Sequence, residues 1–232
     1  MAAPTPVRLH NDFMSRFTHD FVLDPAHCAF VIVDMQYASA CRTTGLGKVL
    51  ADEGLAQLGQ YRFDRVEQVV IPAVQRLLAY FRERGLRVMY LTVGSDMPDY
   101  SDLFPHMQKI ASTFNNRAGA REHEILDDIR PLPGEWVKNK TTTGAFASLD
   151  LATTLRAMGI TDLLFAGVST DLCVDNTARA ASDLGFNCVL LDDACATGSQ
   201  EIHDATLRVF QRSLGRVETV DGVIAELRRA AD

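Results

Sequence analysis

Three side chains that can do chemistry follow short apolar or β-rich runs in this sequence. Asp34 closes the run Cys28–Val33, and Cys173 follows the run Leu163–Val168 after a short turn. Lys140 ends a third segment. If the first two runs are neighbouring parallel strands, their C-terminal ends bring a carboxylate and a thiol to one crevice, and Lys140 can add an ammonium there. Such a combination supplies the parts of a nucleophilic hydrolase.

The size and charge of the chain limit the classes of protein it can belong to. Its 232 residues, of which 47% are hydrophobic, suffice for one well-packed domain. We expect an N-terminal arm over residues 1–27 and a single domain over residues 28–232. The apolar runs are too short to cross a bilayer. With a net charge of −7 and scattered basic residues, nucleic acid and membrane surfaces are not expected partners.

The cysteines indicate a reducing compartment. There are five of them, an odd number, and none forms a C-x-x-C pair. The first residues lack the charged start and long apolar stretch of a secretion signal. A reduced, cytoplasmic protein is therefore the expectation.

Short β-rich runs alternate with helical patterns along the chain. This order predicts an α/β fold, a three-layer sandwich in which a mostly parallel, six-stranded sheet carries helices on both faces. The strands are expected at Cys28–Asp34, Leu86–Val93, Trp136–Lys138, Asp162–Val168, Cys188–Asp192 and Arg216–Val220. The helices are expected at Lys48–Leu58, Asp64–Arg84, Leu149–Met158, Cys173–Leu184, Ser199–Ser213 and Asp221–Ala230.

The helix between the first two strands carries two local signals. Asp64 with Glu67 three residues later has the pattern of an N-terminal cap. Pro72 falls inside the helical pattern, where it predicts a kink or a break. The segment 38–63 that precedes this helix is long, and segments of that length often form lids or subunit contacts.

Three motifs in this sequence resemble those of the isochorismatase-like cysteine hydrolases. The resemblance covers about Cys28 to Val220, and the motifs occur in the family's order at matching separations. They are Val31-Ile32-Val33-Asp34-Met35-Gln36, then Lys140 with Gly144-Ala145-Phe146, then Gly167-Val168-Ser169-Thr170-Asp171-Leu172-Cys173-Val174.

The resemblance implies both a fold and a site. The fold is a six-stranded parallel sheet flanked by helices, and the catalytic triad is formed by Asp34, Lys140 and Cys173. A cis peptide between Val168 and Ser169 is also implied, with the backbone N–H groups of Ser169 and Cys173 side by side as an oxyanion hole. Because the family often forms dimers or tetramers, we expect a homodimer or homotetramer.

Two departures from particular relatives narrow the expected chemistry. Family members that cleave the enol ether of isochorismate lack the cysteine, whereas this chain has Cys173. Nicotinamidases carry an Asp-x-His metal motif shortly after the first strand, but residues 35–64 contain no histidine. We therefore expect no metal and no other cofactor, and a substrate other than nicotinamide.

The predicted function is that of a cysteine amidohydrolase. Cys173, in the first turn of a helix and near Lys140, is expected to favour the thiolate and to attack an amide or carbamoyl carbonyl. Asp34 would take the thiol proton and deliver it to the departing nitrogen. The substrate would be a small amide, ureido or N-carbamoyl compound, and ammonia or an amine would be released through a thioester intermediate.

Candidates for substrate contact are few. Tyr37 follows the first-strand motif and Phe146 ends the lysine motif, so each is a candidate pocket wall or a core residue. Arg117 follows the second strand in a loop, where it can pair with a substrate carboxylate or remain solvated.

Two alternative functions remain open. An ether or ester hydrolase of isochorismatase type would use Asp34 and Lys140 without covalent attack, and alkylation of Cys173 would leave its turnover intact. A redox-sensing or binding protein would use Cys173 as a reactive thiol and release no ammonia from any amide.

Overall fold

A single sheet carries the site residues. The computed structural model describes residues 13–17 and 19–231, and within them lie six strands that pair in the order β3-β2-β1-β4-β5-β6. Every pairing is parallel. The strands are β1 Cys28–Val33, β2 Arg87–Val93, β3 Trp136–Lys140, β4 Asp162–Val168, β5 Asn187–Ala196 and β6 Arg216–Glu218.

The sequences of β1 and β4 explain why these two strands are buried. β1 reads CAFVIV and is buried along its whole length, as is β4, which pairs with it residue by residue from Cys28 opposite Asp162 to Val33 opposite Gly167. Continuous apolar runs of this kind are typical of parallel strands that are covered on both faces. The two strands that precede Asp34 and Cys173 are therefore adjacent at the centre of the sheet.

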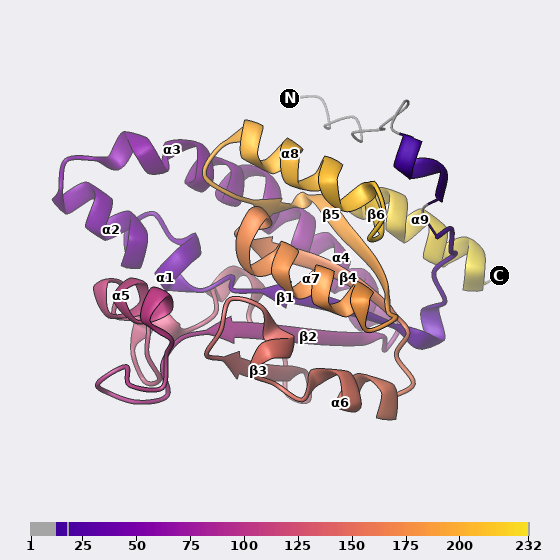
Figure 1. The fold of residues 1–232 in the computed structure, drawn as a ribbon, viewed down its shortest axis with the longest axis horizontal. Helices are drawn as coiled ribbons and strands as arrows, with labels where there is room; N and C mark the ends of the chain where they lie inside the picture. The colour runs from indigo at the N-terminus through magenta and orange to yellow at the C-terminus, as the bar shows by residue number, and fades with distance from the viewer. Residues whose placement is uncertain (1–12, 18, 232) are drawn as a thin grey trace.

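Helices cover both faces of the sheet (Figure 1). One buried cluster joins the sheet to α4 and α9, and a second joins it to α6, α7 and α8. The predicted three-layer α/β sandwich is thus confirmed. The helices are α1 Tyr37–Ala40, α2 Gly45–Asp52, α3 Ala56–Arg65, α4 Ile71–Glu83, α5 Pro105–Thr113, α6 Leu151–Ala157, α7 Asp175–Asp183, α8 Gln200–Gln211 and α9 Val220–Ala231.

The helix expected from Asp64 begins earlier than predicted. α3 starts at Ala56, continues through a π-helical turn at Val66–Val70, and leads into α4. Asp64 thus lies inside a helix and caps nothing; its carboxylate instead accepts a hydrogen bond from Arg42. The π-turn ends two residues before Pro72, which lies in the first turn of α4 and has no N–H to donate to a helical carbonyl.

The predicted N-terminal arm is described only in part, because residues 1–12 and 18 lie outside the described residues. The described portion ends in close contact with the domain. Leu23 is buried, its N–H donates to Glu226 Oε1 at 2.9 Å, and the N–H of Asp24 donates to Asp162 Oδ2 at 2.8 Å.

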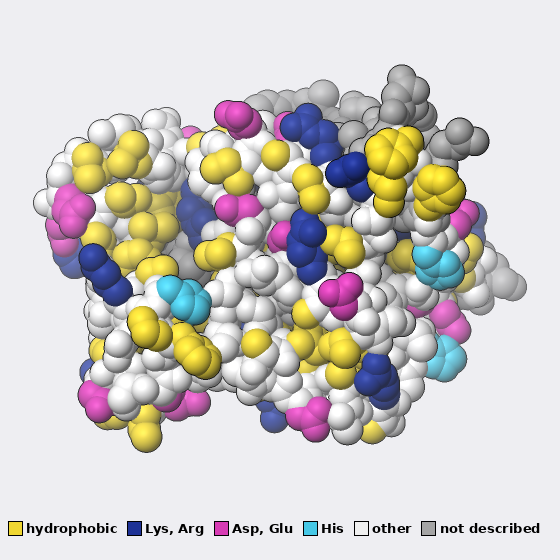
Figure 2. All heavy atoms as spheres, in the orientation of Figure 1, with side chains coloured by type: hydrophobic (Ala, Val, Ile, Leu, Met, Phe, Trp, Pro, Cys, Tyr) yellow, Lys and Arg dark blue, Asp and Glu magenta, His cyan; other side chains and the backbone are white. Residues whose placement is uncertain are grey.

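The visible surface mixes the two signs of charge. Figure 2 shows Lys and Arg side chains spread over this face among Asp and Glu rather than gathered in one patch. Hydrophobic side chains gather over α2 and α3 at one end, where Leu55 and Leu58 are exposed. Within the described residues, no helix has the length and apolarity to span a bilayer.

Candidate active site

Asp34 is fixed at the end of β1 by its backbone. It has a φ of 53°, a left-handed conformation that Asp adopts more readily than most residues. Its N–H donates to Leu91 O at 2.8 Å, and its carbonyl accepts from Gln36 N–H at 2.8 Å and Ser39 Oγ at 2.6 Å. The chain therefore turns sharply at the strand end and leaves the carboxylate in the crevice above the sheet.

A glycine on β4 permits this close approach of the central strands. Gly167 pairs with Val33 and has a φ of 126°. A Cβ atom at this position would lie 1.9 Å from Val33 O. No other residue type fits there without moving the strand that carries Asp34.

Lys140 is the last residue of β3 and reaches Asp34 past the end of β2. Its side chain is 0% exposed, and Nζ donates to Asp34 Oδ2 at 2.9 Å and to Thr142 O at 3.2 Å. A buried ammonium is costly unless it is paired and hydrogen-bonded, and both conditions are met here.

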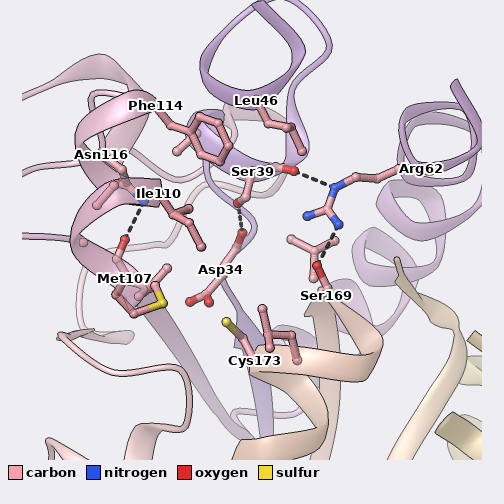
Figure 3. A pocket seen from close by; sticks show the side chains of 16 residues that line it. Asp34, Ser39, Leu46, Arg62, Met107, Ile110, Phe114, Asn116, Ser169 and Cys173 are labelled. Carbon is pink, nitrogen blue, oxygen red and sulfur yellow. Dashed lines mark hydrogen bonds between the residues drawn. The ribbon is translucent and has the colours of Figure 1, made fainter. Parts of the chain in front are cut away.

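Cys173 lies in the π-helical turn Thr170–Val174 that connects β4 to α7. The Val168–Ser169 peptide before this turn is cis, as the family resemblance implied. Thr177 Oγ1 donates to Cys173 O at 2.7 Å and holds the turn to the next helical turn. Figure 3 shows that the Cys173 sulfur points toward the Asp34 carboxylate.

Burial and charge set the protonation of these three groups. Burial raises the pKa of Asp34, although Lys140 and Cys173 oppose the rise. Burial alone would lower the pKa of Lys140, but the neighbouring Asp34 and Cys173 together raise it. Burial, and then the Asp34 charge, raise the pKa of Cys173 above its usual value.

The expectation that Cys173 favours the thiolate is therefore wrong for the free protein. The ammonium of Lys140 favours the thiolate but is outweighed by burial and by the carboxylate. The thiol thus holds its proton and faces a proton acceptor. Asp34 Oδ1 is buried and has no hydrogen-bond partner within the described part of the chain, whereas Oδ2 is held by Lys140.

A cavity of about 180 Å³ opens onto Asp34 and Cys173 (Figure 3). Most of its wall is apolar, and its residues come from α1, α2, α3, α5, the ends of β2 and β4, and the turn after β4. The lining residues are Asp34, Ala38, Ser39, Leu46, Arg62, Val93, Gly94, Met107, Ile110, Ala111, Phe114, Asn116, Val168, Ser169, Leu172 and Cys173.

The three residues expected to contact substrate lie elsewhere. Tyr37, Phe146 and Arg117 are not among the described residues that line this cavity. Tyr37 starts α1 and stacks under the Arg121 guanidinium, which lies 3.8 Å from its ring centroid. Phe146 packs near Phe186 with ring centroids 6.2 Å apart.

The loop around Arg117 nevertheless reaches the cavity through another residue. Arg117 pairs with Ser95 in an isolated β-bridge, and its neighbour Asn116 is the one that lines the cavity. Asn116 Nδ2 donates to Val93 O at 2.8 Å, which fixes its side chain beside the end of β2.

Sequence reasoning missed the α3 and α5 contributions to the cavity. Arg62 projects from α3 and hydrogen-bonds to Ser39 and Ser169, while Met107 and Ile110 come from α5 and Phe114 directly follows it. No motif marks these residues. A further missed contact is His203, whose Nδ1 lies 2.9 Å from Thr170 Oγ1 in the turn that carries the cysteine.

No resident metal is suggested by the side chains. Within the described residues, no group of three or more His, Cys, Asp or Glu side chains is arranged to hold a metal ion. The expectation of a metal-free site stays a prediction.

Comparison with known proteins places this geometry in a family. The model of the isochorismatase domain matches residues 28–222. The chain belongs to the isochorismatase family. This finding agrees with the resemblance drawn from the three motifs, and with the sheet and cis peptide described above.

Curated and solved relatives extend the comparison. The ureidoacrylate amidohydrolase RutB of Variovorax paradoxus is 28% identical over 96% of this chain and 84% of its own length. A nicotinamidase/pyrazinamidase from Bacillus subtilis is 26% identical, with a TM-score of 0.64 over 82% of this chain and 98% of that one. A cysteine hydrolase from Pseudomonas syringae shares the fold, with a TM-score of 0.75, 21% identity, and coverage of 91% and 97% of the two chains.

Proposed function

We propose that this family member is a cysteine amidohydrolase that cleaves the C–N bond of a small amide, ureido or N-carbamoyl compound. The observation that carries the proposal is the arrangement around Asp34. Its Oδ2 atom is held by Lys140, and its Oδ1 atom is buried without a hydrogen-bond partner among the described residues. The Cys173 thiol faces this carboxylate (Figure 3). A protonated nucleophile next to a pre-oriented base is the arrangement that covalent catalysis needs.

In the first step, Cys173 Sγ attacks the carbonyl carbon while its proton passes to Asp34. Because burial and the Asp34 charge raise the pKa of the thiol, attack by the sulfur calls for this transfer of its proton to a neighbouring base. The raised pKa of Asp34 makes the carboxylate a stronger base than an exposed aspartate. Lys140 keeps the carboxylate oriented and stays positively charged throughout.

The negative charge that develops on the carbonyl oxygen needs donors. We assign this role to the backbone N–H groups of Ser169 and Cys173. In the described residues the N–H of Ser169 has no hydrogen-bond partner, so it is available to a substrate oxygen. Removing one such donor from an enzyme typically slows the reaction about 100- to 1,000-fold.

The second half of the cycle releases the products. The C–N bond breaks as the nitrogen takes the proton from Asp34, and ammonia or an amine leaves behind a thioester on Cys173. A water molecule then gives its proton to Asp34 and attacks the thioester carbonyl. The acid product departs, the sulfur regains a proton, and the site returns to its starting state.

The relatives support this class of reaction. The RutB proteins are named as ureidoacrylate amidohydrolases and the Bacillus subtilis neighbour as a nicotinamidase, and both names describe hydrolysis of a non-peptide C–N bond. Drug-sized ligands occupy pockets of about 300–1,000 Å³. The largely apolar cavity here, at about 180 Å³, is smaller than that range and therefore supports a small substrate.

The experiment that tests the proposal is ammonia release across a panel of carboxamides, ureas and N-carbamoyl amino acids. We expect at least one compound to release ammonia, or an amine detected by mass spectrometry, and Cys173→Ala to abolish release while its circular dichroism matches the wild type. Turnover that survives in Cys173→Ala would overturn covalent catalysis and favour ether or ester hydrolysis. No turnover of any compound, with a thiol that still oxidises reversibly, would favour a redox-sensing protein.

A further inference from the structure

One buried cation in the cavity lacks an acidic partner. Arg62, on α3, is 8% exposed and lines the same cavity as Cys173. Its Nε donates to Ser39 O at 2.9 Å, and Nη1 donates to Ser169 Oγ at 2.7 Å. Both acceptors are neutral oxygens, and in the described residues no carboxylate forms an ion pair with this guanidinium.

The contrast with the next arginine of α3 shows that this is unusual. The side chain of Arg65 is only 9% exposed, but it pairs with Asp192 Oδ1 at 3.2 Å and also donates to two backbone carbonyls. A buried charge is normally paired in this way because burial without a counter-charge is costly. The nearby carboxylates of Asp171 and Asp34 form no ion pair with Arg62 and offset only part of the cost of its burial, so its pKa stays below the ordinary value.

The remaining amino group of Arg62 faces the cavity. Nη2 makes no hydrogen bond to any residue that the structure describes, and Figure 3 shows the guanidinium extending toward the space above Asp34 and Cys173. Burial lowers the pKa of Arg62 to about 10, so the group remains charged at neutral pH.

The other charge on the cavity wall does not neutralise Arg62. Asp34 is the acid among the described lining residues, and its carboxylate is already paired with Lys140. Around these groups the wall is hydrocarbon, supplied by the side chains of Leu46, Met107, Ile110, Phe114 and Leu172. The cavity thus combines the Cys173 thiol, an apolar wall and one positive charge without an ion-pair partner.

We propose that Arg62 binds a carboxylate on the substrate, so that the substrate class is a small amide or ureide that also bears an acid group. This inference deepens the proposed function and rests on it for the reaction, but carboxylate binding can be measured separately. A guanidinium is suited to the task because its planar array of N–H donors matches the two oxygens of a carboxylate. The apolar wall would pack on the short hydrocarbon segment between the acid and the scissile bond.

The test compares acids with neutral compounds of the same shape. The pairs are 3-ureidopropanoate with n-propylurea, and succinamate with butanamide; each pair replaces a carboxylate by a methyl group. For wild type we expect kcat/KM to favour the acid of a hydrolysed pair by about 10- to 100-fold, the usual range for a hydrogen-bonded charge pair. Arg62→Met should bring that ratio close to one, and Arg62→Lys should retain part of it.

A matched control separates the local effect from the loss of one positive charge. Arg208 is an exposed arginine in the last turn of α8, so Arg208→Met should leave the ratio unchanged. An equal loss of activity toward acid and neutral compound in Arg62→Met would assign Arg62 to holding Ser169 in place, and would overturn carboxylate recognition. Equal turnover of both compounds by wild type would overturn it as well, while leaving the hydrolase proposal intact.

Binding to Cys173→Ala keeps the inference testable if none of these compounds is hydrolysed. Isothermal titration calorimetry with 3-ureidopropanoate and succinamate should show binding that is lost in Cys173→Ala/Arg62→Met. Binding without turnover would uphold the carboxylate site and count against the reaction. If neither acid binds, or if each binds no better than its neutral partner, the inference fails.

Discussion

Replacing Lys140 by methionine should make the stability of the protein depend on pH in a way that reports on Asp34. The Lys140 side chain is fully buried, and its ammonium lies 2.9 Å from Asp34 Oδ2. Methionine fills a similar volume but removes the positive charge. The carboxylate is then left in a buried site without its counter-charge.

The stability that Lys140→Met loses depends on whether Asp34 stays charged or takes up a proton. Removing one partner of a buried ion pair costs about 3–5 kcal/mol when the other charge must remain. Asp34 avoids part of this cost by taking up a proton, because burial already raises its pKa and Lys140 no longer opposes the rise. In the unfolded chain the same carboxyl titrates near its ordinary pKa of about 3.9.

The difference between the pKa of Asp34 in the folded variant and in the unfolded chain fixes the direction of the pH dependence. Between the unfolded and the folded pKa of Asp34, the folded variant binds a proton that the unfolded chain has released. The free energy of unfolding is therefore highest below about pH 4 and falls as pH rises through the folded pKa, with a limiting slope of about 1.4 kcal/mol per pH unit.

Urea unfolding at several pH values between about 5 and 8 measures this slope. Lys138→Met is the matched control, since Lys138 lies two residues earlier on β3 and is exposed, with its Nζ 5.1 Å from the Trp136 ring centroid. We expect the control to follow the wild type and Lys140→Met to fall more steeply. Equal slopes for the two variants would refute the electrostatic coupling of Asp34 and Lys140.

Three further predictions concern the cysteines, the central strands and the turn that carries Cys173. Peptide-resolved alkylation with iodoacetamide at pH 7 should modify Cys41 before Cys173. Burial tends to raise the pKa of the half-buried Cys41, but hydrogen bonds from Thr43 and Thr44 outweigh burial and lower that pKa, whereas the pKa of Cys173 is raised. Faster labelling of Cys173 would contradict this order. Gly167→Ala should lower the free energy of unfolding by about 3 kcal/mol or more, because the new Cβ meets Val33 O; an unchanged urea midpoint would contradict the tight fit. His203→Leu should cost about 1–3 kcal/mol, since it leaves the buried Thr170 Oγ1 without its hydrogen bond, whereas Asp192 Oδ1 keeps Arg65; an unchanged urea midpoint would show that the His203 contact is dispensable.

The sheet was predictable because its strands are long apolar runs. β4 has the expected bounds, and β1 ends one residue before the expected Asp34. β5 runs to Ala196, beyond the expected end at Asp192. Two adjacent aspartates argue against a buried strand, but here Asp192 pairs with Arg65 and Asp193 accepts from the N–H of Val220. Partners distant in sequence made this extension possible, and no local pattern reveals them.

The grouping of Asp34, Lys140 and Cys173 was also predictable, because parallel strands place their carboxyl ends at one edge. Their protonation was not. The low pKa expected for Cys173 came from a helix terminus and a lysine, both visible in sequence, whereas the degree of burial that reverses the shift depends on the whole fold.

The cavity wall was the least predictable part. α3 is a polar helix, and its sequence does not reveal that Arg62 turns inward. α5, which begins at Pro105, was not expected as a helix at all. Tyr37, Phe146 and Arg117 were chosen for proximity to motifs in the sequence, but side-chain direction decides which residues face the cavity.

A thioester on Cys173 is the most direct test of the account. Once the amide panel has given a substrate, the enzyme is mixed with it, quenched in acid during turnover, and analysed by intact mass and peptide mapping. The account predicts a mass increase equal to the acyl group on Cys173, removed by hydroxylamine and absent in Cys173→Ala. Wild-type turnover by Cys173→Ala, with no adduct on the wild-type cysteine, would contradict it.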